Sequence, residues 1–158
     1  MSSLRFKDLS LLEGPLLVFG GPYSNLAATR AIRKVAEQRS VPAENIICTG
    51  DLVAYCAEPE ETVTLIRDWD IHVVMGNCEQ SLAERAVDCG CGFEQGSVCS
   101  ALSVDWFRYA DSRVADDTRN WMQKLPQGLT FELAGRRFAV VHGGVEKINR
   151  FLFASTPE

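Results

Sequence analysis

Three polar residues of the chain have the chemical types and the neighbours that a metal site requires. Asp51 and Asn77 each come directly after a glycine that ends an apolar run, and His142 comes directly before two glycines. Glycine lets the backbone turn sharply and approach a ligand closely. A carboxylate, an amide oxygen and an imidazole form a mixed oxygen and nitrogen set that suits Mn, Fe or Zn. We therefore take Asp51, Asn77 and His142 as candidate ligands of a divalent metal ion.

Each of these residues also has an ordinary structural explanation. An aspartate after a strand usually caps a turn, and an asparagine after a glycine suits a left-handed turn. A histidine can lie in a core with both ring nitrogens hydrogen-bonded. The joint occurrence of all three, each next to a glycine and preceded by an apolar run, is what favours the metal site.

The elements that must position these residues alternate between strand and helix in the first half of the chain. Strands are predicted at residues 16–19, 46–48 and 72–75, and helices at residues 24–39 and 59–68. The first helix has Ser24 as its expected N-cap, and the second has Pro59 in its first turn. Strands joined by such helices form right-handed βαβ units with parallel strands. The ends of parallel strands meet at one sheet edge, so Asp51 and Asn77 should lie together there.

The second half of the chain changes character. A short helix is predicted at residues 79–87, followed by a Gly- and Cys-rich loop at 88–100 and helical pieces at 104–110 and 116–125. A β-hairpin over residues 129–133 and 137–141 leads to His142. Helical potential returns at residues 145–153. The pattern as a whole predicts an α/β fold with helices flanking a largely parallel sheet.

Length and charge restrict the classes of function. With 158 residues, the chain suits a single domain, residues 1–158. A net charge of −5 argues against a nucleic acid or an anionic membrane held by bulk electrostatics. No run reaches the roughly 18 apolar residues of a membrane span, and no secretory segment is recognisable, so we expect a cytoplasmic location. The oligomeric state is left open.

The first strand-to-helix turn is a second candidate site. Gly20, Gly21, Ser24 and Asn25 precede a helix N-terminus, where backbone N–H groups and the helix dipole favour an anion. A phosphate group would bind there without a metal. The alternative is that these residues form an ordinary turn.

The cysteines provide a third candidate site. Cys89, Cys91 and Cys99 lie in or beside the glycine-rich loop. Together with Cys78 they would supply four thiolates to a zinc ion. The paired Cys-x-x-Cys spacing of common zinc sites is missing. The alternative is that these cysteines are small apolar residues in a tight loop. A cysteine-held zinc module is thus a further functional alternative.

Three motifs, in order, resemble those of the calcineurin-like metallophosphoesterases, particularly their small bacterial and archaeal members. They are Gly50-Asp51-Leu-Val-Ala-Tyr55, Val74-Met-Gly-Asn77 and Val140-Val-His142-Gly-Gly. The resemblance implies an αββα sandwich and hydrolysis of a phosphomonoester or phosphodiester by metal-activated water. It also implies a small phosphorylated molecule as the substrate.

The chain departs from the family pattern at several positions. The family's opening Asp-x-His corresponds to Gly21 and Tyr23, and Cys78 stands where the family has the histidine that protonates the leaving group. No Gly-His-x-His motif follows His142, so we expect a domain shortened at its C-terminus. By the resemblance, Asp51 is the bridging ligand, and with Asn77 and His142 it would hold only the second of two ions.

These departures leave the activity open. The chain would bind one ion or none, and no catalytic residue is assigned, because Cys78 is a poor acid for an alkoxide. The alternative to an active phosphoesterase is a catalytically impaired module of the same fold that binds a phosphate or a nucleotide.

Overall fold

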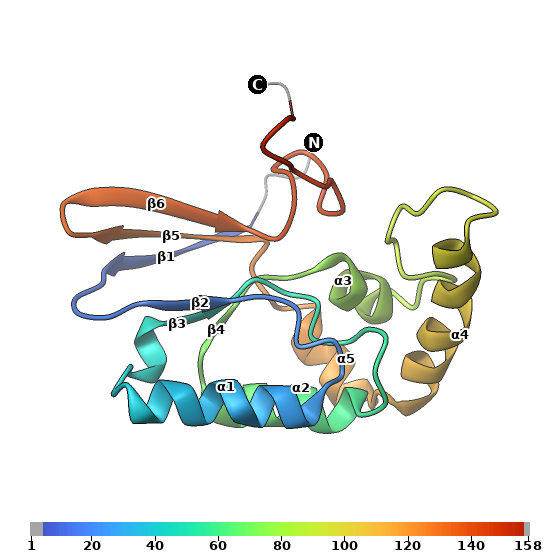
Figure 1. Ribbon diagram of the computed structural model, residues 1–158, viewed down its shortest axis with the longest axis horizontal. Helices are drawn as coiled ribbons and strands as arrows, with labels where there is room; N and C mark the ends of the chain where they lie inside the picture. The colour runs from blue at the N-terminus through green and yellow to red at the C-terminus, as the bar shows by residue number, and fades with distance from the viewer. Residues whose placement is uncertain (1–4, 157–158) are drawn as a thin grey trace.

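Two three-stranded sheets face each other in a computed structural model, which describes residues 5–156 (Figure 1). The first sheet contains β2 (Leu17–Phe19), β3 (Ile46–Cys48) and β4 (His72–Val73), all parallel, with β3 in the centre. The second contains β1 (Phe6–Leu11), β5 (Gly128–Leu133) and β6 (Arg136–Val141). There β5 is central, parallel to β1 and antiparallel to β6. The predicted α/β fold, with its parallel strands and its hairpin, is confirmed.

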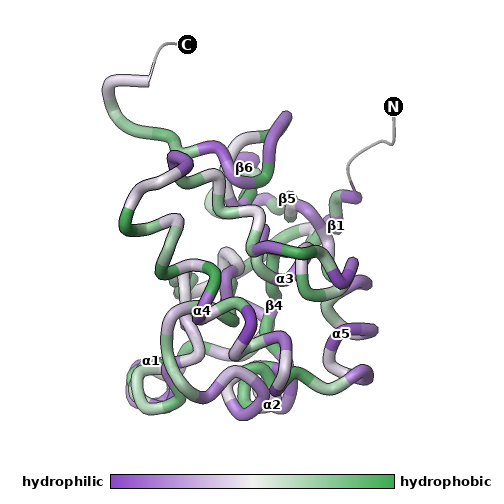
Figure 2. Tube along the Cα trace, turned by 90° about the vertical axis from the view of Figure 1, so that its right-hand side faces the viewer, coloured by the Kyte–Doolittle hydropathy of each residue, from purple (hydrophilic) through white to green (hydrophobic). Residues whose placement is uncertain are grey.

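Two amphipathic helices cover the outer face of the first sheet. They are α1 (Leu26–Gln38) and α2 (Pro59–Trp69), which run side by side below β2, β3 and β4 in Figure 1. Both helices have one buried stripe, with Leu26, Thr29 and Ala36 in α1 and Val63, Ile66 and Trp69 in α2. In Figure 2 the two helices are seen nearly end-on, at the bottom of the molecule. The N-cap of α1 is Asn25 and not Ser24, because the Asn25 side chain accepts a hydrogen bond from the N–H of Ala28.

The central strand β3 connects two hydrophobic cores. Its three residues are completely buried, and successive side chains point to opposite faces of the sheet. Ile46 and Cys48 belong to the core between the first sheet and the helices α1 and α2. Ile47 instead packs with Leu129 and Phe131 between the two sheets. This burial on both faces explains why the strand reads as a continuous apolar run in the sequence.

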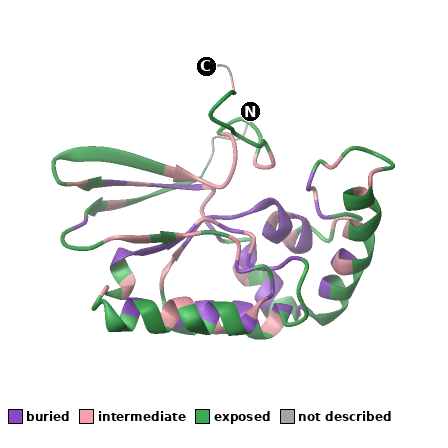
Figure 3. Ribbon diagram, viewed as in Figure 1, coloured by how far each residue is buried: buried purple, intermediate pink, exposed green. Residues whose placement is uncertain are grey.

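The outer face of the second sheet is open to solvent. Most residues of β1 and β6 are exposed, as the green colour of these strands in Figure 3 shows. Residues 5–156 form no helix on this face, so the second outer helical layer of an αββα sandwich is not built by the described residues. The sequence does not predict the strand β1, because its polar residues interrupt the alternation of apolar and polar side chains that indicates a strand.

The remaining helices are η1 (Ala43–Asn45), α3 (Asn77–Ala83), α4 (Val98–Arg113) and α5 (Asp116–Met122). The predicted piece at residues 104–110 is the central part of α4, which begins earlier because Ser97 caps it. None of the helices within residues 5–156 has the length and apolar character needed to cross a bilayer.

The helix predicted at residues 145–153 is wrong, because this segment forms turns. The N–H groups of Gly144 and Arg150 both donate to the carbonyl of Lys147. The Asn149 side chain donates to the carbonyl of Gly90, and Ile148 packs against the main core. These tertiary contacts outweigh the local helical tendency of the segment.

Candidate metal centre where the two sheets meet

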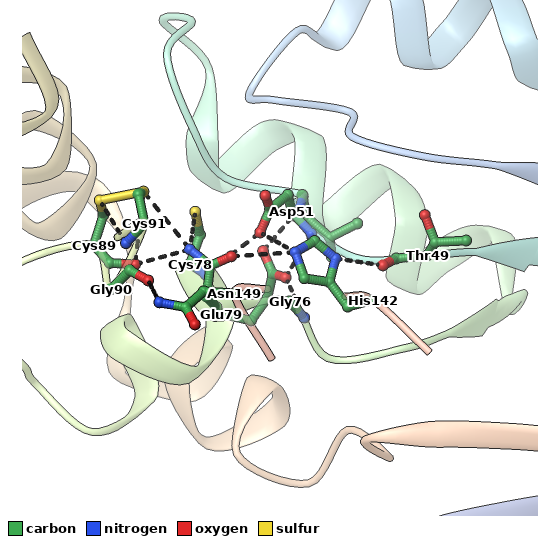
Figure 4. Close-up of polar contacts among 12 residues, drawn as sticks. Thr49, Asp51, Gly76, Cys78, Glu79, Cys89, Gly90, Cys91, His142 and Asn149 are labelled. Carbon is green, nitrogen blue, oxygen red and sulfur yellow. Dashed lines mark hydrogen bonds and ion pairs between the residues drawn. A yellow bond between two sulfur atoms is a disulfide. The ribbon is translucent and has the colours of Figure 1, made fainter. Parts of the chain in front are cut away.

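The structure brings Asp51, Asn77 and His142 together, although they come from different parts of the fold. Figure 4 shows Asp51 and His142 side by side. Asp51 follows β3, Asn77 begins α3 after β4, and His142 follows β6 of the other sheet. The His142 Nε2 atom lies 3.1 Å from Asn77 Oδ1 and 3.5 Å from Asp51 Oδ1. Two oxygen atoms and one nitrogen atom from both sheets thus converge on one point.

The hydrogen bonds around this trio determine which atoms face one another. His142 Nδ1 lies 2.7 Å from the Thr49 carbonyl, which only accepts, so Nδ1 carries the hydrogen and Nε2 of the neutral ring presents a lone pair. The Asn77 amide nitrogen donates to the carbonyl of Cys89 at 3.0 Å, which turns Oδ1 toward His142. With the His142 ring neutral, three electron-rich atoms face one another, an arrangement that a cation between them would stabilise.

These donor atoms fit a divalent metal ion. Ligand atoms about 2.0–2.2 Å from an ion lie roughly 3.0–3.5 Å from one another in octahedral or tetrahedral sites. The two measured separations, 3.1 and 3.5 Å, agree with that spacing. Among the described residues no cluster of three or more His, Cys, Asp or Glu is arranged to hold a metal. A metal ion held between Asp51 and His142 would need the amide oxygen of Asn77 as its third protein ligand.

Glu79 holds the two ligand-bearing loops of the first sheet in place. Its carboxylate is completely buried and accepts hydrogen bonds from the N–H groups of Asp51 and Leu52 (both 2.8 Å), Gly76 (3.0 Å) and Val53 (3.2 Å). Burial first, and then the charge of Asp51, raise the pKa of Glu79 to about 8, against the lowering effect of these hydrogen bonds. Sequence reasoning missed this role, for which the only signal was an acidic residue two positions after Asn77.

The two loops also touch directly through their backbones. A side chain on Gly50, whose φ is +99°, would place its Cβ 2.7 Å from the nitrogen of Gly76 and 2.8 Å from the carbonyl oxygen of Val74. Only glycine fits such a position. The next residue, Asp51, has a φ of 55°, an uncommon conformation for a non-glycine residue. This tight contact and the left-handed turn aim the Asp51 carboxylate at the site.

Cys78 is not placed for acid catalysis or for metal binding as a thiolate. Its side chain is buried, and burial, followed by the charge of Asp51, raises the pKa of the thiol well above its ordinary value. The thiol therefore stays protonated and inside the core. The backbone N–H of Cys78 instead donates a long hydrogen bond, 3.4 Å, to Asp51 Oδ1.

At the turn of residues 20–25, where Gly20, Gly21, Ser24 and Asn25 were expected to bind a phosphate, most of the polar groups are already hydrogen-bonded within the protein. The N–H groups of Gly21 and Ser24 donate to the carbonyls of Gly50 and Leu52, and that of Asn25 donates to Pro22. The Ser24 hydroxyl accepts from Ala54, and the Asn25 side chain caps α1. The hydrogen bonds from Gly21 and Ser24 hold the turn against the loop that carries Asp51.

The cysteines proposed as zinc ligands are not gathered around one point. Cys89 and Cys91 form a disulfide, whereas Cys99 is exposed in α4. The disulfide lies near Asp51 and His142, as Figure 4 shows. The Cys89 carbonyl accepts a hydrogen bond from the Asn77 side chain and so orients it. In this arrangement the cysteine pair supports the Asn77 side chain and offers no thiolates to zinc.

A cavity of about 620 Å³ opens in front of the trio. Asp51, Asn77 and His142 line it, and the tyrosines Tyr23 and Tyr55 form another part of its wall. Residues 148–152 close a further side and bring Arg150 to the cavity. Arg150 forms no ion pair within residues 5–156, so its guanidinium group is available to an anionic ligand.

Comparison with known proteins adds evidence of family. The calcineurin-like phosphoesterase superfamily domain matches residues 24–157. An uncharacterized protein from Methanocaldococcus jannaschii is 36% identical over 132 residues, which make up 84% of this chain and 50% of that protein. The chain thus spans about half the length of this curated relative.

Solved structures share the fold at low sequence identity. A hypothetical protein from Pyrococcus horikoshii has a TM-score of 0.67 at 18% identity, with 90% of this chain and 60% of that chain covered. A protein described as a putative diadenosine tetraphosphatase has a TM-score of 0.61 at 17% identity, with coverages of 89% and 55%. A metallophosphoesterase from Sphaerobacter thermophilus gives 0.56 at 18% identity, with coverages of 96% and 52%.

Proposed function

Because this chain belongs to the calcineurin-like phosphoesterase superfamily, we propose that it is a metal-dependent phosphoesterase that uses one divalent ion, Mn, Fe or Zn. Its substrate would be a small phosphorylated molecule, either a phosphomonoester or a phosphodiester. The observation that carries the proposal is the convergence of Asp51 Oδ1, Asn77 Oδ1 and His142 Nε2 at the mouth of a 620 Å³ cavity.

The residues of the site have separate tasks in this proposal. Asp51 provides the negative charge that attracts the ion, and Asn77 and His142 complete the ligand set. The Thr49 carbonyl keeps the His142 ring oriented, and Glu79 keeps Asp51 and the start of α3 together. A bound divalent ion supplies Lewis-acid chemistry: it polarises a phosphoryl oxygen and lowers the pKa of water.

The positive charge of Arg150 favours binding of a phosphorylated ligand over a neutral one. Arg150 lines the same cavity as the three candidate ligands, and its guanidinium group lacks an acidic partner among the described residues. Arginine presents several N–H donors in a planar fork that matches phosphoryl oxygens. A ligand with its phosphoryl group between the metal centre and Arg150 would satisfy both.

Calorimetry and hydrolysis assays test the proposal together. We expect purified protein to bind one Mn²⁺ ion and to hydrolyse p-nitrophenyl phosphate or bis(p-nitrophenyl) phosphate only when the ion is present. Asp51→Asn should lose both properties. Asp68→Asn, the same change on an exposed residue of α2, should keep both. Absence of Mn²⁺ uptake by the unaltered protein, or full turnover by Asp51→Asn, would exclude the proposed function.

A binding module without turnover is the second candidate function. It is favoured by the buried Cys78 thiol, which cannot reach a leaving group, and by the absence of side-chain ligands at Gly21. In the same experiment such a module would bind Mn²⁺ and inorganic phosphate but leave both nitrophenyl esters intact.

A further inference from the structure

The ring of Tyr23 lies directly over Gly21. A Cβ atom added to Gly21 would overlap the end of the Tyr23 ring and would lie 2.6 Å from the Tyr23 hydroxyl oxygen. The aromatic ring therefore fills the space that any side chain at position 21 would need. The missing side chain at 21 and the tyrosine at 23 form one steric unit.

The backbone of Tyr23 is held by the loop that carries Asp51, and its half-exposed ring packs against another tyrosine. Tyr23 has a φ of 52°, and its N–H donates to the carbonyl of Asp51 at 3.1 Å. Its carbonyl accepts from the N–H of Cys56, and its ring packs against Tyr55 with 5.1 Å between ring centres. The position of the phenol is thus set by the loop that carries Asp51.

The Tyr23 hydroxyl is a free donor at the metal centre. The side chain lines the 620 Å³ cavity together with Asp51, Asn77 and His142. With residues 5–156 as possible partners, the hydroxyl makes no hydrogen bond. A tyrosine hydroxyl carries one hydrogen that it can donate to an acceptor oxygen.

We propose that the Tyr23 phenol occupies the place beside Asp51 where a second ion would otherwise lie, and that its hydroxyl donates a hydrogen bond to a phosphoryl oxygen of the ligand. This inference rests on the proposed function, because it assumes a phosphoryl group next to the ion at Asp51, Asn77 and His142. A neutral donor would then do part of the charge stabilisation that a second cation provides in a two-metal site. The site would hold one ion and one phenol.

Two titrations of the full chain test this inference. Mn²⁺ binding is measured first, followed by binding of inorganic phosphate to the Mn²⁺-loaded protein. The variants are Tyr23→Phe, which removes only the hydroxyl, and Gly21→Ala, which displaces the ring. The matched control is Tyr109→Phe, because the Tyr109 hydroxyl donates to the carbonyl of Ala57 and does not line the cavity.

The expected result separates the phenol from the ion. The unaltered protein should bind one Mn²⁺ ion per chain. Tyr23→Phe should keep that Mn²⁺ affinity and bind phosphate about tenfold to hundredfold more weakly, as expected for a hydrogen bond to a charged group. Gly21→Ala should weaken phosphate binding in the same way, and Tyr109→Phe should change neither affinity.

Three results would overturn the inference and leave the proposed function standing: two Mn²⁺ ions per chain, unchanged phosphate affinity in Tyr23→Phe, or loss of Mn²⁺ affinity in that variant. The last would make Tyr23 a metal ligand. If the unaltered protein takes up no Mn²⁺, the proposed function fails, and this inference fails with it.

Discussion

At the scale of single residues, Glu79 is the side chain on which the geometry of the site depends most. A buried carboxylate is costly unless donors surround it, and Glu79 has four backbone N–H donors. Both oxygens of the Glu79 carboxyl group can accept, whether the group is ionised or protonated. Glutamine keeps the shape but offers only one accepting oxygen, so two of the four N–H groups would face an amide nitrogen. We expect Glu79→Gln to lower the free energy of unfolding by about 2–4 kcal/mol, measured by urea denaturation.

Glu84→Gln is the matched control for that measurement. Glu84 lies at the C-terminal end of the same helix, α3, and is exposed, so the same change there should alter stability by less than about 0.5 kcal/mol. Equal effects of the two substitutions would show that the hydrogen bonds of Glu79 do not anchor the loops.

The pKa of Glu79 also predicts how stability depends on pH in metal-free protein. The folded state binds this proton more tightly than the unfolded chain does, with a pKa of about 8 against an ordinary value of 4.5. Both states are protonated below about pH 4, and the unfolded chain ionises first as the pH rises. This contribution to stability is therefore lost as the pH rises through about 8. Urea midpoints in EDTA should fall between about pH 5.5 and 8.5, more steeply for the unaltered protein than for Glu79→Gln.

The sequence was informative about individual ligand positions and uninformative about what supports them. Asp51, Asn77 and His142 could be located because each follows an apolar strand and adjoins a glycine, and strand ends gather at one edge. The Thr49 carbonyl that orients His142 carries no residue-type signal, since every residue has a carbonyl. The N–H groups around Ser24 donate to carbonyls of the loop that carries Asp51, and no local sequence pattern reveals these hydrogen bonds.

At the scale of elements, α1 illustrates a correct helix with a misassigned start. Asn25 Oδ1 accepts the N–H of Ala28 at 2.9 Å, which satisfies one of the donors left free at the first turn. Asn25→Ala should cost about 1 kcal/mol of stability. Asn25→Asp, which keeps the acceptor and adds a charge that the helix dipole favours, should be as stable as the unaltered protein. Thermal unfolding of both variants checks this, and a stable Asn25→Ala would contradict the assignment of the cap.

Elements with strong local patterns were predictable, and those made by tertiary contact were not. The strand β3 and the helix α2 appear close to their predicted bounds, because burial on both faces and a proline in the first turn are local features. The edge strand β1 is mostly exposed, so it carries no apolar alternation and exists by pairing with β5. Residues 145–153 form turns and not the predicted helix, because Ile148 and Asn149 contact residues that are far away in the sequence.

At the scale of the whole molecule, the candidate metal centre links the two sheets. Asp51 and Asn77 belong to the sheet of β2, β3 and β4, whereas His142 ends β6 of the other sheet. Away from the site, the sheets are held together by a small apolar core that includes Ile47 and Leu129. Leu129→Ala should cost about 2–5 kcal/mol of stability in urea denaturation, since Leu129 is completely buried between the sheets. Leu102→Ala, on the exposed side of α4, should cost far less.

An ion bound across the sheets should stabilise the folded chain, because the unfolded chain does not hold the three ligands together. At a free Mn²⁺ concentration of about 100 times Kd, the gain is about 2.7 kcal/mol by mass action. We expect Mn²⁺ to raise the urea midpoint of the unaltered protein and to leave that of His142→Ala unchanged. The chain has one other histidine, His72 in β4, which lies outside the site and provides the control. His72→Ala should respond to Mn²⁺ like the unaltered protein; an equal response in His142→Ala would mean that the ion binds without joining the two sheets.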